Sequence, residues 1–285
     1  MKIGIIGAEN SHTIAIARLV NIDRAIDDLT IDYLWGETEG IAREVAEKGQ
    51  IPNIVTKPQD MLGKVDGVVV DHRHPKYHLD AVEPFVRESV PVFVDKPFCY
   101  RSKKGMAFLE LAQKKNTPVT SFTSLVVCES FRRFKTQVAA IGIFRAACTS
   151  GPCELNSKYG GIFFYGVHQV EIVLNAFGFD VESVVIIRNQ NEAVGILHYS
   201  DGRMVCINFL SDPYAKFQAA AIGSESNVCV DIDKDHNTQT EVVRIFTEMF
   251  RNRIEPIEHK KLLRPVQVLE AMEKSLESGR VEMVI

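Results

Sequence analysis

Short apolar runs alternate with amphipathic stretches over the first 121 residues, and this rhythm constrains the fold most strongly. The apolar runs are continuous, which is typical of strands buried on both faces, and they lie near residues 2–7, 29–35, 66–71, 90–95 and 118–123. Helices are predicted between them, near residues 11–22, 38–48, 75–88 and 102–115. Because parallel strands are joined by right-handed crossovers, residues 1–121 are expected to form an α/β Rossmann domain with a doubly wound parallel sheet.

The rhythm changes beyond residue 122. Helices are predicted near 126–140 and 160–177, with a strand near 142–149 between them and several strands after them. Asp201-Gly202 separates two apolar runs and predicts a β-hairpin. Two late helices are indicated by apolar residues at helical spacing, namely Val242, Phe246 and Met249, then Val266, Leu269, Met272 and Leu276. Residues 122–285 are therefore expected to form an α+β domain with a mainly antiparallel sheet.

Composition excludes several classes of function. A length of 285 residues suits two domains, and a net charge of −4 without a basic run argues against nucleic-acid binding. No stretch reaches membrane-spanning length, and Met1-Lys2-Ile3-Gly4 lacks the pattern of a secretory signal, so a cytoplasmic location is expected. The six cysteines include no Cys-x-x-Cys pair and are interpreted as reduced packing residues, Cys99 among them.

The motif Asp95-Lys96-Pro97 follows the apolar run Val90–Val94. Open α/β sheets bind ligands at the carboxyl ends of their strands, and proline stops further pairing there. A lysine beside a carboxylate at that edge can hydrogen-bond a substrate hydroxyl. The alternative is a solvated ion pair in a turn.

The first turn retains only one glycine of the phosphate-binding fingerprint Gly-x-Gly-x-x-Gly. It reads Gly7-Ala8-Glu9-Asn10-Ser11-His12. Backbone N–H groups at Asn10 and Ser11 are candidates for holding a phosphate, while the alternative is a loop that binds no dinucleotide and only caps the helix. Glu37 lies where an acidic side chain accepts ribose hydroxyls, and no adjacent arginine suits a 2′-phosphate. NAD is therefore favoured over NADP.

Histidines are concentrated in the segment Asp71–His78, which raises the possibility of a metal site. His72 and His74 lie on one loop and would need distant ligands such as His168 or Glu171 to complete a tetrahedral site. We therefore predict that the protein holds no metal.

A second candidate centre lies in the predicted helix near 160–177, which opens with Gly160-Gly161. Tyr165, His168 and Glu171 fall on neighbouring turns and share a face. Imidazole titrates near neutrality, so His168 is a candidate general base, and the alternative is a histidine packed in the core.

Taken together, these motifs resemble the Gfo/Idh/MocA oxidoreductases, named for glucose-fructose oxidoreductase and inositol dehydrogenase. Four segments carry the resemblance: Ile3–Gly7, Val92–Phe98, Tyr159–Glu171 and Leu276–Val281. The family's usual central motif is Glu-Lys-Pro, of which Asp95-Lys96-Pro97 is a conservative variant. Where many inositol-dehydrogenase-like members have an aspartate four residues before the histidine, this chain has Phe164, so Glu171 or Asp95 is needed as the charge partner.

The resemblance implies an NAD-dependent dehydrogenase that acts on a hydroxyl or carbonyl of a sugar, cyclitol or related polyol. The resemblance implies that His168 is the base and that Lys96 stabilises the alkoxide. Substrate contacts are expected from Tyr165, Glu171 and Lys158. For two of these an alternative is equally open, since Tyr165 can be a packed core residue and Lys158 an ordinary surface lysine. The expected cofactor-binding residues are Gly7, Glu9, Asn10, Ser11, His12, Glu37, Asp71, His72, His74, His78, Asp95 and Lys96.

The family also commonly forms homo-oligomers, so a dimer or tetramer is expected. Two alternatives remain open. One is a lyase or hydrolase of the same fold with a transient NAD redox cycle, and the other is a non-catalytic protein that senses NAD or a ligand.

Overall fold

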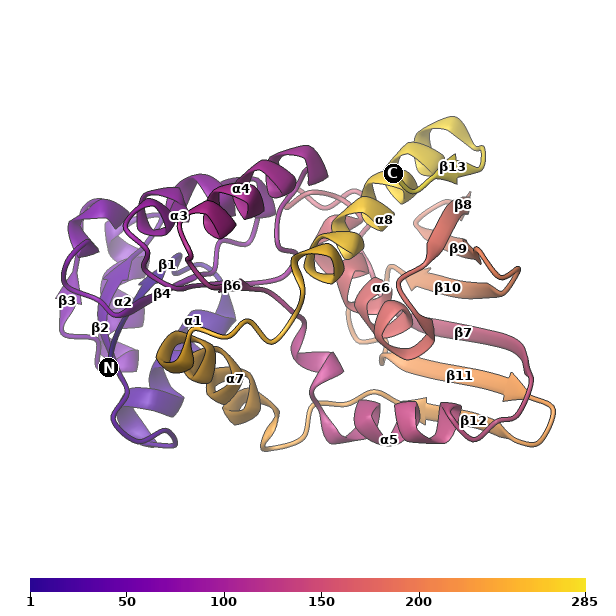
Figure 1. Cartoon of the computed structure of the whole chain (residues 1–285), viewed down its shortest axis with the longest axis horizontal. Helices are drawn as coiled ribbons and strands as arrows, with labels where there is room; N and C mark the ends of the chain where they lie inside the picture. Colours follow the sequence, from indigo (N-terminus) through magenta and orange to yellow (C-terminus); the bar gives the residue numbers. More distant parts are fainter. The chain divides into compact units, whose positions relative to one another are not determined.

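Parallel strands organise the first part of the chain in the computed structural model, which describes residues 1–285 (Figure 1). The sheet has six strands in the order β3-β2-β1-β4-β5-β6, and every neighbouring pair is parallel. Its strands are β1 (Lys2–Ile6), β2 (Thr30–Trp35), β3 (Asn53–Ile54), β4 (Gly67–Val70), β5 (Val92–Val94) and β6 (Val119–Thr120). This order is that of a Rossmann fold, which confirms the predicted doubly wound sheet.

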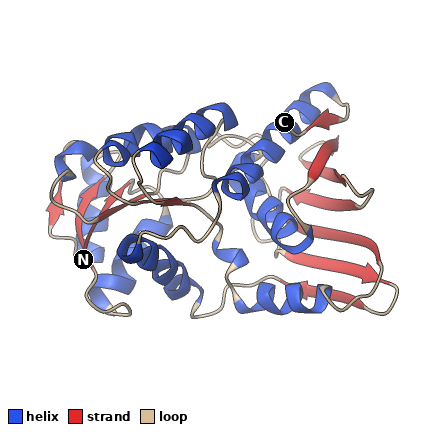
Figure 2. Cartoon of the chain, in the orientation of Figure 1, coloured by secondary structure: helices blue, strands red, loops and turns tan.

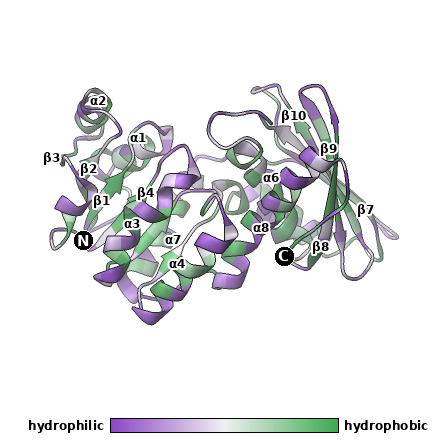
Figure 3. Ribbon diagram, turned by 90° about the horizontal axis from the view of Figure 1, so that it is seen from above, coloured by the Kyte–Doolittle hydropathy of each residue, from purple (hydrophilic) through white to green (hydrophobic).

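Helices connect these strands in the predicted alternation. They are α1 (Ser11–Ala17), continued by a π-helical turn at Arg18–Ile22, then α2 (Glu39–Gly49), α3 (His78–Arg87) and α4 (Ser102–Lys114). Figure 1 shows α3 and α4 along one side of the sheet and α1 along the other. The residues of the central strands β4 and β5 are buried on both faces, as in Val68, Val69 and Val70 of β4, and Figure 3 colours β1 as hydrophobic. The continuous apolar runs are explained by this double coverage.

One late helix, α7 (Thr238–Asn252), packs against the first sheet. The chain divides into one unit of Met1–Phe122 with Gln239–Leu262 and a second unit of Thr123–Thr238 with Leu263–Ile285. These units differ from the expected domains 1–121 and 122–285. The difference arises because the apolar face of α7 packs against the first sheet. Phe246 stacks on Phe93 with 4.9 Å between ring centroids, and the ring of Phe250 lies against Gly67, where a side chain would overlap it.

The second sheet has seven strands in the order β12-β11-β7-β10-β9-β8-β13. They are β7 (Phe144–Pro152), β8 (Val181–Asn189), β9 (Glu192–Tyr199), β10 (Met204–Leu210), β11 (Gln218–Gly223), β12 (Asn227–Asp231) and β13 (Glu282–Met283). Only β7 and β10 pair in parallel, so the sheet is mainly antiparallel as predicted. The predicted hairpin at Asp201-Gly202 joins β9 to β10.

Three helices accompany this sheet: α5 (Glu129–Val138), α6 (Phe163–Phe177) and α8 (His259–Ser278). Figure 2 shows α6 and α8 on one side of the strands and no helix on the other. Burial alternates accordingly along β10, where Val205, Ile207 and Phe209 are buried and Met204 is exposed. No helix of the protein is both long enough and apolar enough to cross a bilayer.

Candidate active site

Two acidic side chains follow neighbouring strands of the first sheet where those strands end. The N–H of Asp71 donates to the carbonyl of Ile6 at 2.7 Å, and the N–H of Asp95 donates to the carbonyl of Val70 at 2.9 Å. Both residues therefore extend the parallel ladder by one step and place their carboxylates at its carboxyl edge. This is the edge at which open α/β sheets bind ligands.

The glycine-poor turn supplies the polar partners of these carboxylates. Asn10 Nδ2 donates to Asp71 Oδ1 at 2.7 Å and to Asp95 Oδ2 at 3.2 Å, so one amide bridges both acids. Thr13 Oγ1 donates to Asp71 Oδ2 at 2.6 Å. Asn10 and Thr13 therefore tie the turn and the start of α1 to the ends of β4 and β5. Thr13 was not predicted from the sequence, because a threonine in the first turn of a helix carries no distinctive signal.

Asp95 also has two basic neighbours. His12 Nδ1 lies 3.1 Å from Asp95 Oδ1, and Lys96 Nζ lies 3.7 Å from Asp95 Oδ2. Asp95 and Lys96 are both buried, and the Lys96–Pro97 peptide bond is cis. The predicted Asp95–Lys96 pair is thus a buried ion pair and not a solvated one.

The two carboxyl groups differ in charge state. Burial raises the pKa of Asp71 well above its usual range, and the nearby charge of Asp95 adds to this effect. Burial also acts to raise the pKa of Asp95, but the charges of His12 and Lys96 outweigh it and hold that pKa well below its usual range. Of the two, Asp95 therefore holds its negative charge more strongly than Asp71.

His12, Asp71 and Asp95 are the one group of side chains positioned to share a cation, with a ligand atom from each within 4.8 Å of the others. The ammonium of Lys96 beside Asp95 disfavours a second cation there. The histidines singled out in the sequence, His72 and His74, do not belong to this group.

The turn and β2 provide features that fit a dinucleotide. Gly7 has φ +112°, and a Cβ there would lie 2.7 Å from the carbonyl carbon of Asp71, so only glycine suits this close approach. Glu37 Oε2 accepts hydrogen bonds from the N–H groups of Ala8 at 2.8 Å and Glu9 at 3.1 Å. Glu37 Oε1 is buried without a hydrogen-bond partner, which leaves an acceptor for a ribose hydroxyl.

The histidine loop after β4 has a mainly supporting role. His78 is fully buried, and its ring nitrogens lie 3.0 Å from the carbonyl of Pro97 and 2.8 Å from that of His72. It braces the loops that follow β4 and β5 against each other. Asp71 is likewise fully buried, so for these two residues the structure indicates loop support in place of the direct cofactor contact expected from the sequence.

The remaining loop residues are placed differently. The ring of His72 is buried beside Trp35, whereas His74 accepts the N–H of Lys76 with its Nδ1 and is partly exposed. In the turn, Glu9 and Ser11 are exposed.

The second unit holds the other predicted catalytic group. His168 lies on α6 and is buried, with its Nδ1 at 2.6 Å from Thr123 Oγ1. The N–H of Thr123 donates to Glu171 Oε2 at 2.7 Å, so Glu171 connects to the histidine through Thr123. The sequence did not predict this role of Thr123, which is the last residue of the predicted strand near 118–123.

Aromatic rings surround His168. Tyr165 is 37 % exposed and its ring lies 5.5 Å from that of His168, while Phe217 lies at 5.3 Å on another edge. Phe164, at the position of the family aspartate, packs between Tyr159 and Tyr165 with 4.9 Å between centroids in each pair. Lys158 is exposed, with its Nζ 5.0 Å from the Tyr159 ring centroid.

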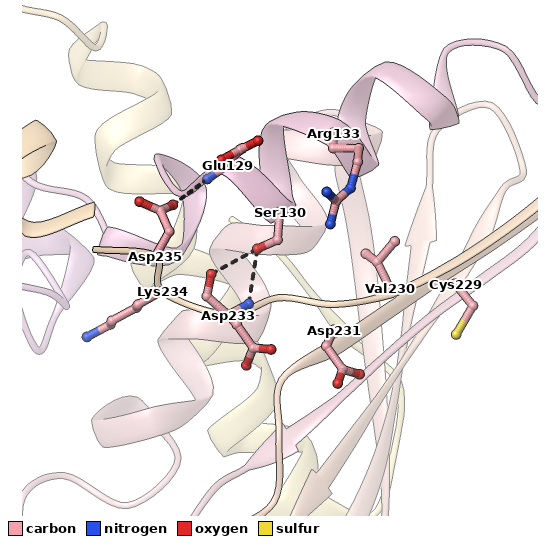
Figure 4. A pocket seen from close by; sticks show the side chains of 9 residues that line it. All are labelled: Glu129, Ser130, Arg133, Cys229, Val230, Asp231, Asp233, Lys234 and Asp235. Atoms are coloured by element: carbon pink, nitrogen blue, oxygen red, sulfur yellow. Dashed lines mark hydrogen bonds between the residues drawn. The ribbon is translucent and has the colours of Figure 1, made fainter. Parts of the chain in front are cut away.

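A separate pocket of about 550 Å³ opens on the second unit between the start of α5 and β12 (Figure 4). Its wall is held by Ser130, which donates to the carbonyl of Asp233 and accepts from its N–H, both at 3.0 Å. None of the predicted site residues lines it.

The first unit therefore has the fold and the strand-end polar groups of a dinucleotide-binding domain. Residues 1–123 match the model of the Gfo/Idh/MocA oxidoreductase family, described as an NAD-binding Rossmann fold. This match confirms the resemblance found in the sequence and the assignment of NAD as the cofactor class. No curated protein matches the chain.

Solved structures with the same fold extend over the whole chain. GenD2 from gentamicin A biosynthesis, in complex with NAD, shares 14 % identity at a TM-score of 0.88, covering 100 % of this chain and 96 % of that one. Myo-inositol 2-dehydrogenase from Lactobacillus plantarum shares 14 % at 0.86, covering 100 % and 99 %. Scyllo-inositol dehydrogenase from Lactobacillus casei shares 13 % at 0.84, covering 100 % and 98 %.

Proposed function

We propose that this protein is an NAD-dependent dehydrogenase that oxidises a CH–OH group, or reduces the matching carbonyl, of a sugar, cyclitol or related polyol. The observation that carries the proposal is the buried Asp95–Lys96 pair at the carboxyl edge of a family-matched NAD-binding sheet. The inositol dehydrogenases among the structures of the same fold support the substrate class.

Each end of the cofactor has a candidate partner. The unpaired Glu37 Oε1 accepts a ribose hydroxyl, and Gly7 allows the turn that would face the phosphates to pass close to the backbone of Asp71. When bound, NAD supplies the hydride acceptor. An acidic partner for the ribose also favours NAD over NADP, since a 2′-phosphate would meet the charge of Glu37.

The chain's own contribution is charge and proton handling. Lys96 provides a fixed positive charge that stabilises the alkoxide as it develops. His168 accepts the hydroxyl proton in the tautomer in which its Nδ1 donates to Thr123 Oγ1, because Nε2 then carries the lone pair of the ring. Tyr165, Glu171 and Lys158 remain the proposed substrate contacts.

A panel of polyols tested with NAD and with NADP examines this proposal directly. Reduced cofactor that accumulates with a polyol supports a dehydrogenase. Turnover without accumulation would instead indicate a lyase or hydrolase with an internal redox cycle, and binding without turnover would indicate a sensor. The sensor reading is favoured by two observations, the loss of two fingerprint glycines and the replacement of the family aspartate by Phe164.

Variants of the proposed catalytic pair provide the second test. Lys96→Ala and His168→Ala should each lower kcat by about a hundredfold, with little change in NAD affinity. Because both act in one proton-transfer unit, the double variant should be scarcely worse than the poorer single variant. Lys103→Ala, at an exposed position, is the control. A His168→Ala variant with normal kcat and an unchanged pH–rate profile would identify His168 as a packing residue.

A further inference from the structure

Two basic side chains lie over aromatic rings on the loops that follow β4 and β5. Lys76 Nζ is 4.7 Å from the centroid of the Tyr77 ring, and the guanidinium carbon of Arg101 is 3.9 Å from that of the Tyr100 ring. The ring of His74 contacts both tyrosines, with centroid separations of 5.9 Å from Tyr77 and 5.0 Å from Tyr100. One histidine therefore joins the two cation-bearing rings.

His74 contributes a hydrogen-bond donor to this basic cluster. Its Nδ1 accepts the backbone N–H of Lys76 at 3.2 Å, so the proton of the neutral ring is on Nε2. Burial lowers the pKa of His74 to about 4, and the charges of Lys76 and Arg101 add to the effect. A partly exposed ring with one N–H donor thus lies in a positive field, which suits an anion.

No acidic side chain pairs with Lys76, whose ammonium contacts only the Tyr77 ring. The acids nearby have other basic partners. Asp80, in the first turn of α3, pairs with Lys104 at 2.6 Å, and Asp95 is already paired with Lys96 at 3.7 Å. The charge of Lys76 is therefore available to a ligand.

The same pair of loops carries the proposed alkoxide stabiliser. Tyr100 follows Lys96 by four residues in the loop after β5. The buried ring of His78 joins this loop to the one after β4, since its nitrogens lie 3.0 Å from the carbonyl of Pro97 and 2.8 Å from that of His72. The basic cluster and Lys96 thus belong to one braced part of the sheet edge.

The phosphates of the cofactor are expected at another place on this edge. The glycine-poor turn follows β1, and Glu37, the proposed ribose partner, follows β2. Because the strands lie in the order β2-β1-β4-β5, the loops after β4 and β5 are on the opposite side of the turn from Glu37. A dinucleotide binds across this edge, so that side is where its nicotinamide half meets the substrate.

We propose that His74, Lys76 and Arg101 form a subsite for an anionic group of the substrate, a carboxylate or a phosphate. The inference rests on the proposed dehydrogenase function and narrows its substrate class from polyols in general to sugar acids or polyol phosphates. The Nε2–H of His74 and the ammonium of Lys76 donate to the anionic oxygens, and Arg101 supplies a second positive charge. The anion does not react, and it serves to hold the substrate on the loops that carry Lys96.

Matched substrates test the subsite in turnover. Each neutral polyol is compared with the acid that carries a carboxylate in place of its terminal CH₂OH group and with its phosphate ester. One of the charged forms should have a kcat/KM at least about tenfold above that of the neutral form, and its KM should rise with ionic strength. Equal kcat/KM for neutral and charged forms would overturn the proposal.

Lys76→Met removes the charge and keeps an apolar side chain over Tyr77. It should raise KM for the charged substrate about tenfold with kcat unchanged, and it should leave the neutral substrate unaffected. Lys64→Met is the matched control, because Lys64 is likewise exposed with its Nζ 5.8 Å from the centroid of a tyrosine ring, that of Tyr33. A Lys76→Met variant that behaves like Lys64→Met would contradict the role of Lys76.

Nitrogen NMR of histidine-labelled protein gives a readout that does not depend on activity. Inorganic phosphate added at pH 7 to the NAD-saturated protein should shift the Nε2 signal of His74 saturably, and Lys76→Met should lose this response. The signal is the one missing from His74→Gln, and the exposed His236 is the internal control. No response to phosphate once NAD is bound, or a response retained in Lys76→Met, would overturn the subsite.

The failures of the two proposals are distinguishable. A protein that reduces NAD with neutral polyols alone keeps the dehydrogenase function and contradicts the anionic subsite. A protein that reduces NAD with no polyol contradicts the dehydrogenase function, and the phosphate response of His74 still decides whether the subsite binds an anion.

Discussion

His72 should make the first unit sensitive to mild acid. Its side chain is buried against Trp35, Tyr77 and His78, and its Nδ1 has no hydrogen-bond partner. Burial, aided by the charge of His78, lowers the pKa of His72 from 6.5 to about 3. The folded protein therefore keeps this ring neutral in a range of pH where an unfolded chain protonates it.

The sign and size of the effect follow from this difference. Because the pKa is lower in the folded state, the unfolded chain binds more protons below pH 6.5, and stability is lost as the pH falls from there toward 3. Between about pH 7 and about pH 5, His72 alone should remove ~2 kcal/mol from the free energy of unfolding. The pKa of His74 is also lowered, to about 4, so the whole loop acts in the same direction.

Urea unfolding followed by Trp35 fluorescence measures this loss, since the tryptophan lies 5.5 Å from the His72 ring. His72→Phe keeps an aromatic ring but cannot titrate. Between about pH 7 and about pH 5, the free energy of unfolding of this variant should therefore fall by ~2 kcal/mol less than that of the natural protein. His236→Gln, at an exposed position, is the control and should behave like the natural protein. If His72→Phe loses as much stability as the natural protein, His72 is not the buried neutral group inferred here.

Further predictions concern the cofactor turn, the metal and assembly. Gly7→Ala should destabilise the protein by about 1–3 kcal/mol in thermal unfolding, and an unchanged melting temperature would contradict the close approach to Asp71. Glu37→Gln should lower the affinity for NAD about tenfold in calorimetry and should reduce the preference for NAD over NADP. If the variant and the natural protein bind NAD with equal affinity, Glu37 does not contact the ribose. Purified protein should contain no stoichiometric zinc, and a metal-to-protein ratio near one that is lost in His12→Ala would contradict this. Light scattering should give the molar mass of a dimer or tetramer. Ile187 on β8 is 64 % exposed, and Ile187→Asp should reduce the measured molar mass.

The fold could be predicted because its signals are local. Buried parallel strands need continuous apolar runs, and the Asp201-Gly202 turn specifies its hairpin. The short edge strand Asn53–Ile54 escaped prediction because it is exposed and carries no apolar run. The packing of α7 against the first sheet was not predicted for another reason. Its apolar residues at helical spacing indicate a buried face, but they do not indicate which sheet that face contacts.

The site was predictable where a motif gives both residue type and position. Lys96 and Glu37 are of this kind. The bridge from Asn10 to Asp71 and Asp95 joins residues 61 and 85 positions apart, so only the order of the strands brings them together. The same is true of His12 with Asp95 and of Thr123 with His168, whose pairing depends on side-chain direction.

The fate of a deuterium label shows whether the protein transfers a hydride from its substrate to NAD. A polyol identified by the panel, deuterated at its carbinol carbon, should be incubated with the protein and NAD, and the cofactor then analysed by mass spectrometry and NMR. A dehydrogenase should deliver one deuterium to C4 of the nicotinamide for each carbonyl product formed. Reduced cofactor without that deuterium, or product formed while the label stays on the substrate carbon, would contradict hydride transfer from this substrate to NAD.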